Sequence, residues 1–147
     1  MYSLFKVCNN IEYRRKSPFV YSGGINFTHG VASGDPFDTS VLLWVRAAPI
    51  GNPLPDQSVP ICVSYTVWVD AGSATNRKAV TGGTAFTSYD VDWTVKVEAS
   101  NLRADTKSLY QFADCTDKNT VSPMGKTRTL ASPNSPFPYQ QNLKQLY

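Results

Sequence analysis

Hydrophobic and polar residues alternate with a period of two through most of the chain after residue 25. Glycine, proline, asparagine and aspartate separate the alternating segments. This pattern is typical of β-strands that bury one face and expose the other. The clearest case is 93–99, "WTVKVEA", where the side chains expected to face inward are Trp93, Val95, Val97 and Ala99. The pattern predicts an all-β domain.

The spacing predicts short strands at 41–46, 61–70, 78–88, 93–99, 109–115 and 125–130. The segment 41–46, "VLLWVR", is apolar on both faces, which indicates a strand covered on both sides or close to the centre of a sheet. The pair Gly82-Gly83 predicts either a two-residue hairpin turn or a bulge. About seven short strands favour an immunoglobulin-like or fibronectin type III-like antiparallel β-sandwich over a barrel.

The 147 residues suffice for one domain. We expect a leader at 1–24, the sandwich at 25–132 and a proline-rich linker or tail at 133–147. The leader lacks a continuous apolar region and a clear cleavage site, so it is not assigned as a signal peptide. Cys8 within it has no assigned role. No stretch approaches the ~20 consecutive apolar residues of a membrane helix, so no membrane span is expected.

The formal net charge of +3 is too weak to indicate a nucleic-acid partner. Arg14, Arg15 and Lys16 form the only run of basic residues, and we interpret them as part of a solvated leader.

Candidate chemistry centres on "FTHGVASGDP", residues 27–36, which contains His29, the only histidine. A hydrolytic metal centre needs three or more ligands, and two-metal phosphoesterases usually use several imidazoles. One histidine cannot supply them, so we expect no catalytic residue, no metal ligand and no cofactor in this chain. His29 is interpreted as a packed or interface residue. Asp90 and Asp92 could offer oxygens to Ca²⁺ or Mg²⁺, although a solvent-facing strand edge is favoured.

The same segment is interpreted as architecture. Gly30 and Gly34 are expected to permit a tight backbone path, and Asp35-Pro36 is expected to set a turn. Trp44, in the strand that follows, is expected to anchor the core.

Cys62 and Cys115 are candidates for a disulfide, with two free thiols as the alternative. In a fibronectin-like sandwich the third and sixth strands are antiparallel neighbours, so the start of one faces the end of the other. Both cysteines are expected on the outward faces of their strands, where a cross-strand bridge is geometrically feasible. Asn26 begins "NFT", an acceptor sequence for N-glycosylation. Together these features favour secretion.

Four stretches together resemble the N-terminal domain of PhoD-type secreted alkaline phosphatases, the fungal branch especially: "FTHGVASGDP", "SVLLWVR", "DVDWTVKVEASNLRADTKSLYQF" and "VSPMGKTRT". The resemblance runs from about Ile25 to Ser132. It implies a β-sandwich that precedes a metallophosphoesterase domain, and that missing domain is the part expected to use Ca²⁺ and iron.

The D-x-H, G-D-x-x-D, G-N-H-[DE] and G-H-x-H blocks of such a catalytic domain do not occur in this sequence. The family corner, Leu-x-Pro-x-x-x-Tyr, is also altered, because Leu102 is followed by Ala104 and Ser108. Tyr110 is the residue that could compensate for the lost corner tyrosine.

We therefore expect a non-catalytic accessory domain of a PhoD-like phosphatase, present as a fragment, truncated product or shortened paralogue. Its partner would be the metallophosphoesterase domain. The alternative is an independent extracellular module that binds carbohydrate or protein through Trp68 and Tyr89.

Overall fold

The computed structural model describes residues 20–51, 59–72 and 77–135. The expected leader up to residue 19, with Cys8, and the tail from residue 136 lie outside these residues. Within them, no helix has the length and hydrophobicity that crossing a membrane demands.

The described strands form two principal sheets and one short pair. A three-stranded sheet has the order β2–β3–β7, formed by Val31–Gly34, Val41–Arg46 and Thr94–Ala99. A four-stranded sheet has the order β6–β5–β8–β9, formed by Ala79–Thr87, Ile61–Val69, Lys107–Asp114 and Gly125–Arg128. The short pair joins β1, Ile25–Asn26, to β4, Ala48–Pro49.

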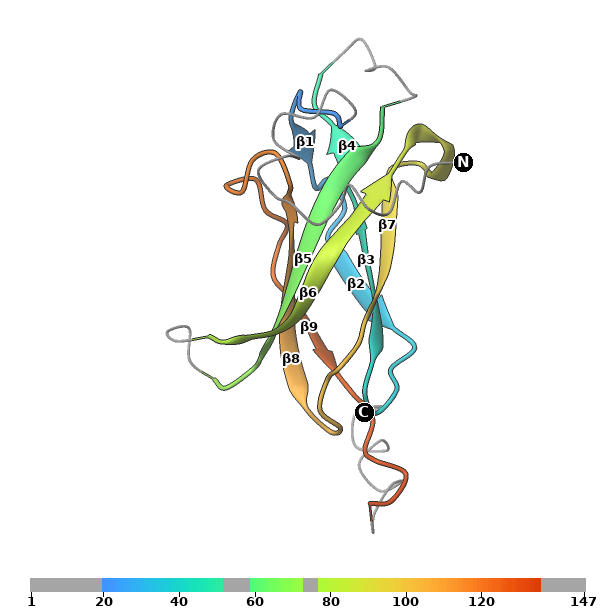
Figure 1. Cartoon of the computed structure of the whole chain (residues 1–147), viewed down its shortest axis with the longest axis vertical. Coiled ribbons are helices and arrows are strands. Elements are labelled where there is room, and N and C mark those ends of the chain that lie inside the picture. Colours follow the sequence, from blue (N-terminus) through green and yellow to red (C-terminus); the bar gives the residue numbers. More distant parts are fainter. Residues whose placement is uncertain (1–19, 52–58, 73–76, 136–147) are drawn as a thin grey trace, which may run out of the picture.

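The two principal sheets lie in separate layers, and every pairing within them is antiparallel (Figure 1). Together they hold seven strands. The predicted antiparallel β-sandwich is therefore confirmed, and the strand order is compatible with the immunoglobulin-like or fibronectin type III-like arrangement.

The core lies between the two sheets and follows the period-two pattern. Along β3 the side chains of Val41, Leu43 and Val45 are buried, while the intervening residues are half-buried. The opposing layer contributes the inward side chains of β5 and β8, which include Ile61, Val63, Val67, Tyr110 and Phe112. Burying one such aliphatic side chain contributes about 1.5–3 kcal/mol, so the alternation itself supplies the main force that holds the layers together.

The expectation that Trp44 anchors the core is wrong. Trp44 occupies the other face of β3 from Val41, Leu43 and Val45, and it is half-buried. Since successive side chains of a strand point to opposite faces, a buried Val45 places its neighbour Trp44 outside. The tryptophan of the core is Trp93, which is 3% exposed.

Gly82 and Gly83 form no hairpin turn. They lie within the continuous strand β6, opposite Thr66 and Tyr65 of β5, and the register shift falls nearby, between Val67 and Trp68. A Cβ atom on Gly83 would approach the Tyr65 ring to 3.0 Å. The glycine therefore gives the Tyr65 ring room to lie along β6.

The altered corner keeps its packing. Leu102 is buried and its N–H donates to the carbonyl of Thr39 (3.0 Å), and Ser108, at the position where the resemblance led us to expect tyrosine, is also buried. Tyr110 is 1% exposed, and its hydroxyl is hydrogen-bonded to the Ser33 side chain of the other sheet. Burial raises the pKa of Tyr110, and the Ser33 contact opposes that rise. Tyr110 thus supplies buried aromatic area and links the layers at a different point.

Candidate functional site

The segment 27–36 leads into and forms the first strand of the three-stranded sheet. β2 pairs with β3 so that Ala32 lies opposite Trp44 and Gly34 opposite Leu42. A Cβ atom on Gly34 would lie 2.9 Å from Trp44 Cζ3, so the absence of a side chain allows the indole to lie across β2. Gly30 has open space at its Cβ position and no positive φ angle, so no tight path requires a glycine there.

Asp35 and Pro36 begin the connection between β2 and β3. Asp35 has a left-handed φ of 44°, which aspartate tolerates better than most residues. The loop closes when the Phe37 N–H donates to the Ser40 carbonyl (2.8 Å), so the chain does turn here. Phe37 is left 63% exposed at the end of the sandwich.

A small polar cluster lies at the opposite end of the same sheet. The Arg46 guanidinium binds Asp92 through two nitrogens, Nε at 3.1 Å and Nη2 at 2.8 Å. Its Nη1 donates to Thr28 Oγ1 (3.2 Å), and that hydroxyl lies 2.8 Å from His29 Nδ1. His29 is exposed rather than packed in the core.

The sequence led us to expect Asp92 on a solvent-facing strand edge, but Asp92 does not lie on one. Tyr89–Val91 form one turn of 3-10 helix, and Asp92 and Trp93 both have left-handed φ angles (49° and 58°) before β7 begins. Hydrogen bonding from Arg46 is the main cause that holds the pKa of Asp92 below its ordinary value. Since Arg46 occupies the carboxylate, Asp92 serves as an anchor for the turn.

The family resemblance assigns calcium and iron to a metallophosphoesterase domain and not to this chain, and the donors in the described residues form no candidate site for either metal. Nowhere in 20–51, 59–72 and 77–135 do three or more His, Cys, Asp or Glu side chains gather as a metal site would need. The only histidine touches Thr28, and the Asp92 carboxylate of the same cluster is bound by Arg46. These side chains therefore provide no set of ligands for either metal.

Cys62 and Cys115 form a disulfide, with their Cα atoms 5.5 Å apart. It joins the start of β5 to the end of β8, as the antiparallel pairing predicted, and the Cys115 N–H donates to the Cys62 carbonyl (3.2 Å). Both side chains were expected to point outward, and both are buried. Cys62 does lie on the outer face with Ser64, but Phe86 is its direct cross-strand neighbour there. The glycosylation candidate Asn26 is exposed on β1.

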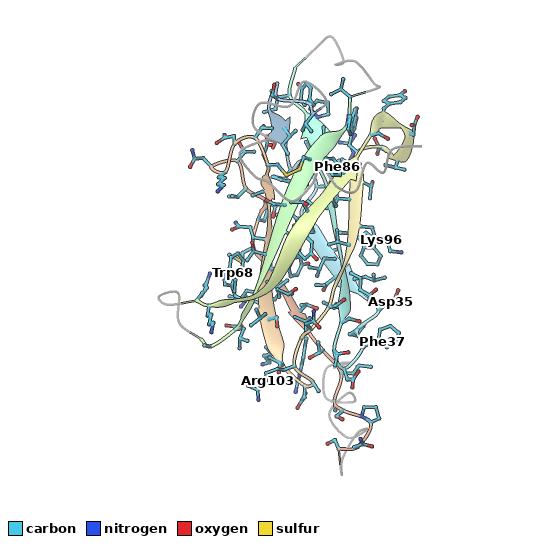
Figure 2. All side chains as sticks on the ribbon, in the orientation of Figure 1. Asp35, Phe37, Trp68, Phe86, Lys96 and Arg103 are labelled. Carbon is cyan, nitrogen blue, oxygen red and sulfur yellow. A yellow bond between two sulfur atoms is a disulfide. The ribbon has the colours of Figure 1, made fainter. Side chains whose placement is uncertain are left out.

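Trp68 and Tyr89 do not form a common binding surface. Trp68 lies opposite Ala79 at the start of β6, whereas Tyr89 follows the far end of that strand. Nine residues of β-strand span roughly 30 Å. Figure 2 shows this separation through the labelled Trp68 and Phe86, and the Tyr89 ring already contacts Trp93 at a centroid distance of 6.2 Å.

A half-apolar outer face on the three-stranded sheet is the feature that sequence reasoning missed. It consists of the outward-facing residues Ala32, Gly34, Leu42, Trp44, Lys96 and Glu98, and we call it the β3 face. Lys96 Nζ lies 5.4 Å from the Trp44 ring centroid, in a cation–π contact. The apolar residues on both faces of "VLLWVR" were the available signal, and β3 is indeed the central strand of its sheet.

The fold and these sites define an all-β sandwich domain. It is held by a disulfide and an arginine–aspartate pair, and one of its sheets has a half-apolar outer face. A family model described as "PhoD-like phosphatase, N-terminal domain" matches residues 15–131. The chain belongs to this family.

Relatives of known name agree with that assignment. Over 115 residues the chain is 38% identical to alkaline phosphatase D of Bacillus subtilis (strain 168), covering 76% of this chain and 18% of that protein. A solved structure described as "Structure of PhoD" superposes with a TM-score of 0.62 at 36% identity, over 78% of this chain and 21% of that one. The chain thus spans about a fifth of the length of these relatives.

Proposed function

We propose that this chain is the N-terminal accessory domain of a PhoD-like phosphatase, which does not cleave phosphate esters by itself and packs against a metallophosphoesterase domain. The observation that carries the proposal is the match of a PhoD-like N-terminal domain over residues 15–131, with about four-fifths of alkaline phosphatase D outside the similarity. A sandwich alone would define no function, so the proposal rests on the family.

The chemistry of the described residues supports a non-catalytic role. Metal-dependent hydrolysis of phosphate esters requires bound metal ions that activate a water molecule and stabilise the leaving oxygen. The described residues offer one imidazole, already in contact with Thr28, and no cluster of three ligating side chains. We further propose that the parent protein is secreted, since the Cys62–Cys115 bond persists in oxidising compartments.

An activity assay tests the proposal. The purified 147-residue chain is incubated with chromogenic phosphate monoesters and diesters, Ca²⁺ and iron, beside a mock-purified sample and alkaline phosphatase D as positive control. We expect product release equal to that of the mock sample. Turnover that rises with the concentration of the purified chain would contradict the proposal.

The alternative, an independent carbohydrate- or protein-binding module, depends on Trp68 and Tyr89, which lie at opposite ends of β6. The sequence of the full-length transcript separates the two functions. Metallophosphoesterase blocks downstream of this segment support the accessory domain, whereas a stop codon there, with a secretion signal upstream, supports the module.

A further inference from the structure

We infer that the β3 face, together with the Phe37 loop at its end, is the surface that docks against the metallophosphoesterase domain. This inference rests on the proposed function and assigns to it a particular side of the sandwich. It is carried by the composition of the face, by the rim around it and by the point at which the chain leaves the fold.

The centres of the two outer faces differ in chemistry. In the β3 face the middle strand presents Leu42 and Trp44, and the neighbouring strand β2 adds only the small residues Ala32 and Gly34. The corresponding centre of the four-stranded sheet presents Ser64, Thr66 and Gln111, and the apolar residues of that outer face, Ala113, Phe86, Trp68 and Leu109, lie on either side of this polar centre. An outward face of an antiparallel sheet that meets only water is normally polar. The apolar centre of the β3 face therefore fits a second layer of protein.

The rim of the β3 face extends this apolar surface. A shallow hollow beside Leu42 is bounded by Asp35, Phe37, Glu98 and Leu130. Phe37 and Leu130 are 63% and 39% exposed. Figure 2 shows Lys96, Asp35 and Phe37 along one side of the molecule. An exposed aromatic residue within a charged rim is the arrangement that anchors many protein interfaces.

The size of the face shows why the rim has to take part. Three strands about 4.8 Å apart and roughly 20 Å long offer only about 300 Å². Interfaces between domains of one chain bury about 600–1,500 Å². Counted on both partners, the sheet alone reaches only the lower end of this range, so a contact of ordinary size also includes the Phe37 loop and Leu130.

The point at which the chain leaves the sandwich indicates which domain covers the β3 face. After β9, the Leu130 N–H donates to the Phe37 carbonyl (2.9 Å), and the Leu130 carbonyl accepts from the Asp105 N–H (2.8 Å). These bonds hold the outgoing chain against the rim of the β3 face. In a PhoD-like phosphatase the N-terminal domain is followed by the rest of the protein, so the connection to that part leaves the sandwich past Leu130, beside this face. A domain tethered there meets the β3 face at high effective concentration.

Cysteine labelling in a full-length chimera tests the inference. The chain replaces the homologous segment of B. subtilis alkaline phosphatase D, with Cys8→Ser in every protein. Phe37→Cys and Thr84→Cys are made in the chimera and in the lone chain, and maleimide labelling rates are compared. We expect labelling of Phe37→Cys to slow at least about tenfold in the chimera, which corresponds to about 1.4 kcal/mol for exposing the docked site.

Thr84→Cys is the matched control, because Thr84 is exposed on the outer face of the four-stranded sheet and its rate should be equal in both proteins. Thermal melts establish that every variant is folded, and retained phosphatase activity establishes the same for the chimeras. Protection of Thr84→Cys instead would overturn the assigned face and leave the proposed function intact. Protection of neither cysteine would overturn docking itself. Concentration-dependent protection of Phe37→Cys in the lone chain would assign the face to a second copy and overturn the inference.

Discussion

Single residues decide how closely neighbouring strands can approach, and Gly125 is the sharpest example. At the start of β9 it lies opposite Tyr110, and a Cβ atom there would overlap the buried tyrosine ring. Tyr110 is 1% exposed, so its ring has little room to move away. The close approach of β9 to β8 thus depends on a missing side chain.

We predict that Gly125→Ala lowers the free energy of unfolding by about 1–3 kcal/mol, the usual cost of overpacking a core. Chemical denaturation followed by tryptophan fluorescence measures the change. Gly30→Ala is the control, because its Cβ position is open and its φ is not positive, and we expect a change within about 1 kcal/mol. Equal effects of the two substitutions would show that Tyr110 relaxes freely.

Residue-level expectations from sequence were correct where alternation alone decided the answer. Trp93 and Val95 were correctly predicted to face inward. Trp44 was not, because β3 is apolar on both faces and its sequence does not reveal which face meets the other sheet. Nor does sequence reveal that Asp92 and Trp93 take left-handed backbone angles, since neither residue type signals them strongly.

At the scale of elements, the Arg46–Asp92 pair ties the end of β3 to the turn that begins β7. Arg46 lowers the pKa of Asp92 chiefly through its hydrogen bonds. A carboxyl whose folded pKa is depressed contributes stability that is complete above its unfolded pKa. That contribution disappears as pH falls through the lower, folded pKa.

We predict that Arg46→Gln moves the pKa of Asp92 up towards its ordinary value. An NMR titration of the side-chain carboxyl carbon in the acid range measures this shift. Arg128→Gln is the matched control, because Arg128 pairs with Asp105, away from the turn that holds Asp92, and should leave Asp92 unchanged. If the Asp92 carboxyl has its ordinary pKa in the unmodified protein, the hydrogen bonds between Arg46 and Asp92 are not formed in solution.

Most strands were predictable because each has one apolar and one polar face, a signal that is local. The segment 78–88 was predicted to form strand, but its continuity was left open because Gly82-Gly83 also marks turns, and the contacts of the pair with Tyr65 on the adjacent strand are not a local signal. The extent of the β3 face could not be predicted for a similar reason, although the apolar residues on both faces of 41–46 indicated a covered or central strand. Its definition needs the register of three strands at once, which the local pattern does not contain.

For the whole molecule, the Cys62–Cys115 disulfide restrains the unfolded chain across a sequence separation of 53 residues. We predict that the double substitution Cys62→Ser with Cys115→Ser lowers stability by about 2–5 kcal/mol. Urea unfolding measures it, with Cys8→Ser in both proteins so that only the disulfide differs. Coincident unfolding midpoints would show that the bond does not stabilise the fold.

The same bond has a consequence for proteolysis. The segment it encloses contains β6, β7 and nearly all of β5 and β8. A protease that cuts one peptide bond between the two cysteines therefore releases no fragment while the sulfur atoms stay joined. The nicked molecule would migrate as one band on a non-reducing gel and separate into two pieces only after thiol treatment.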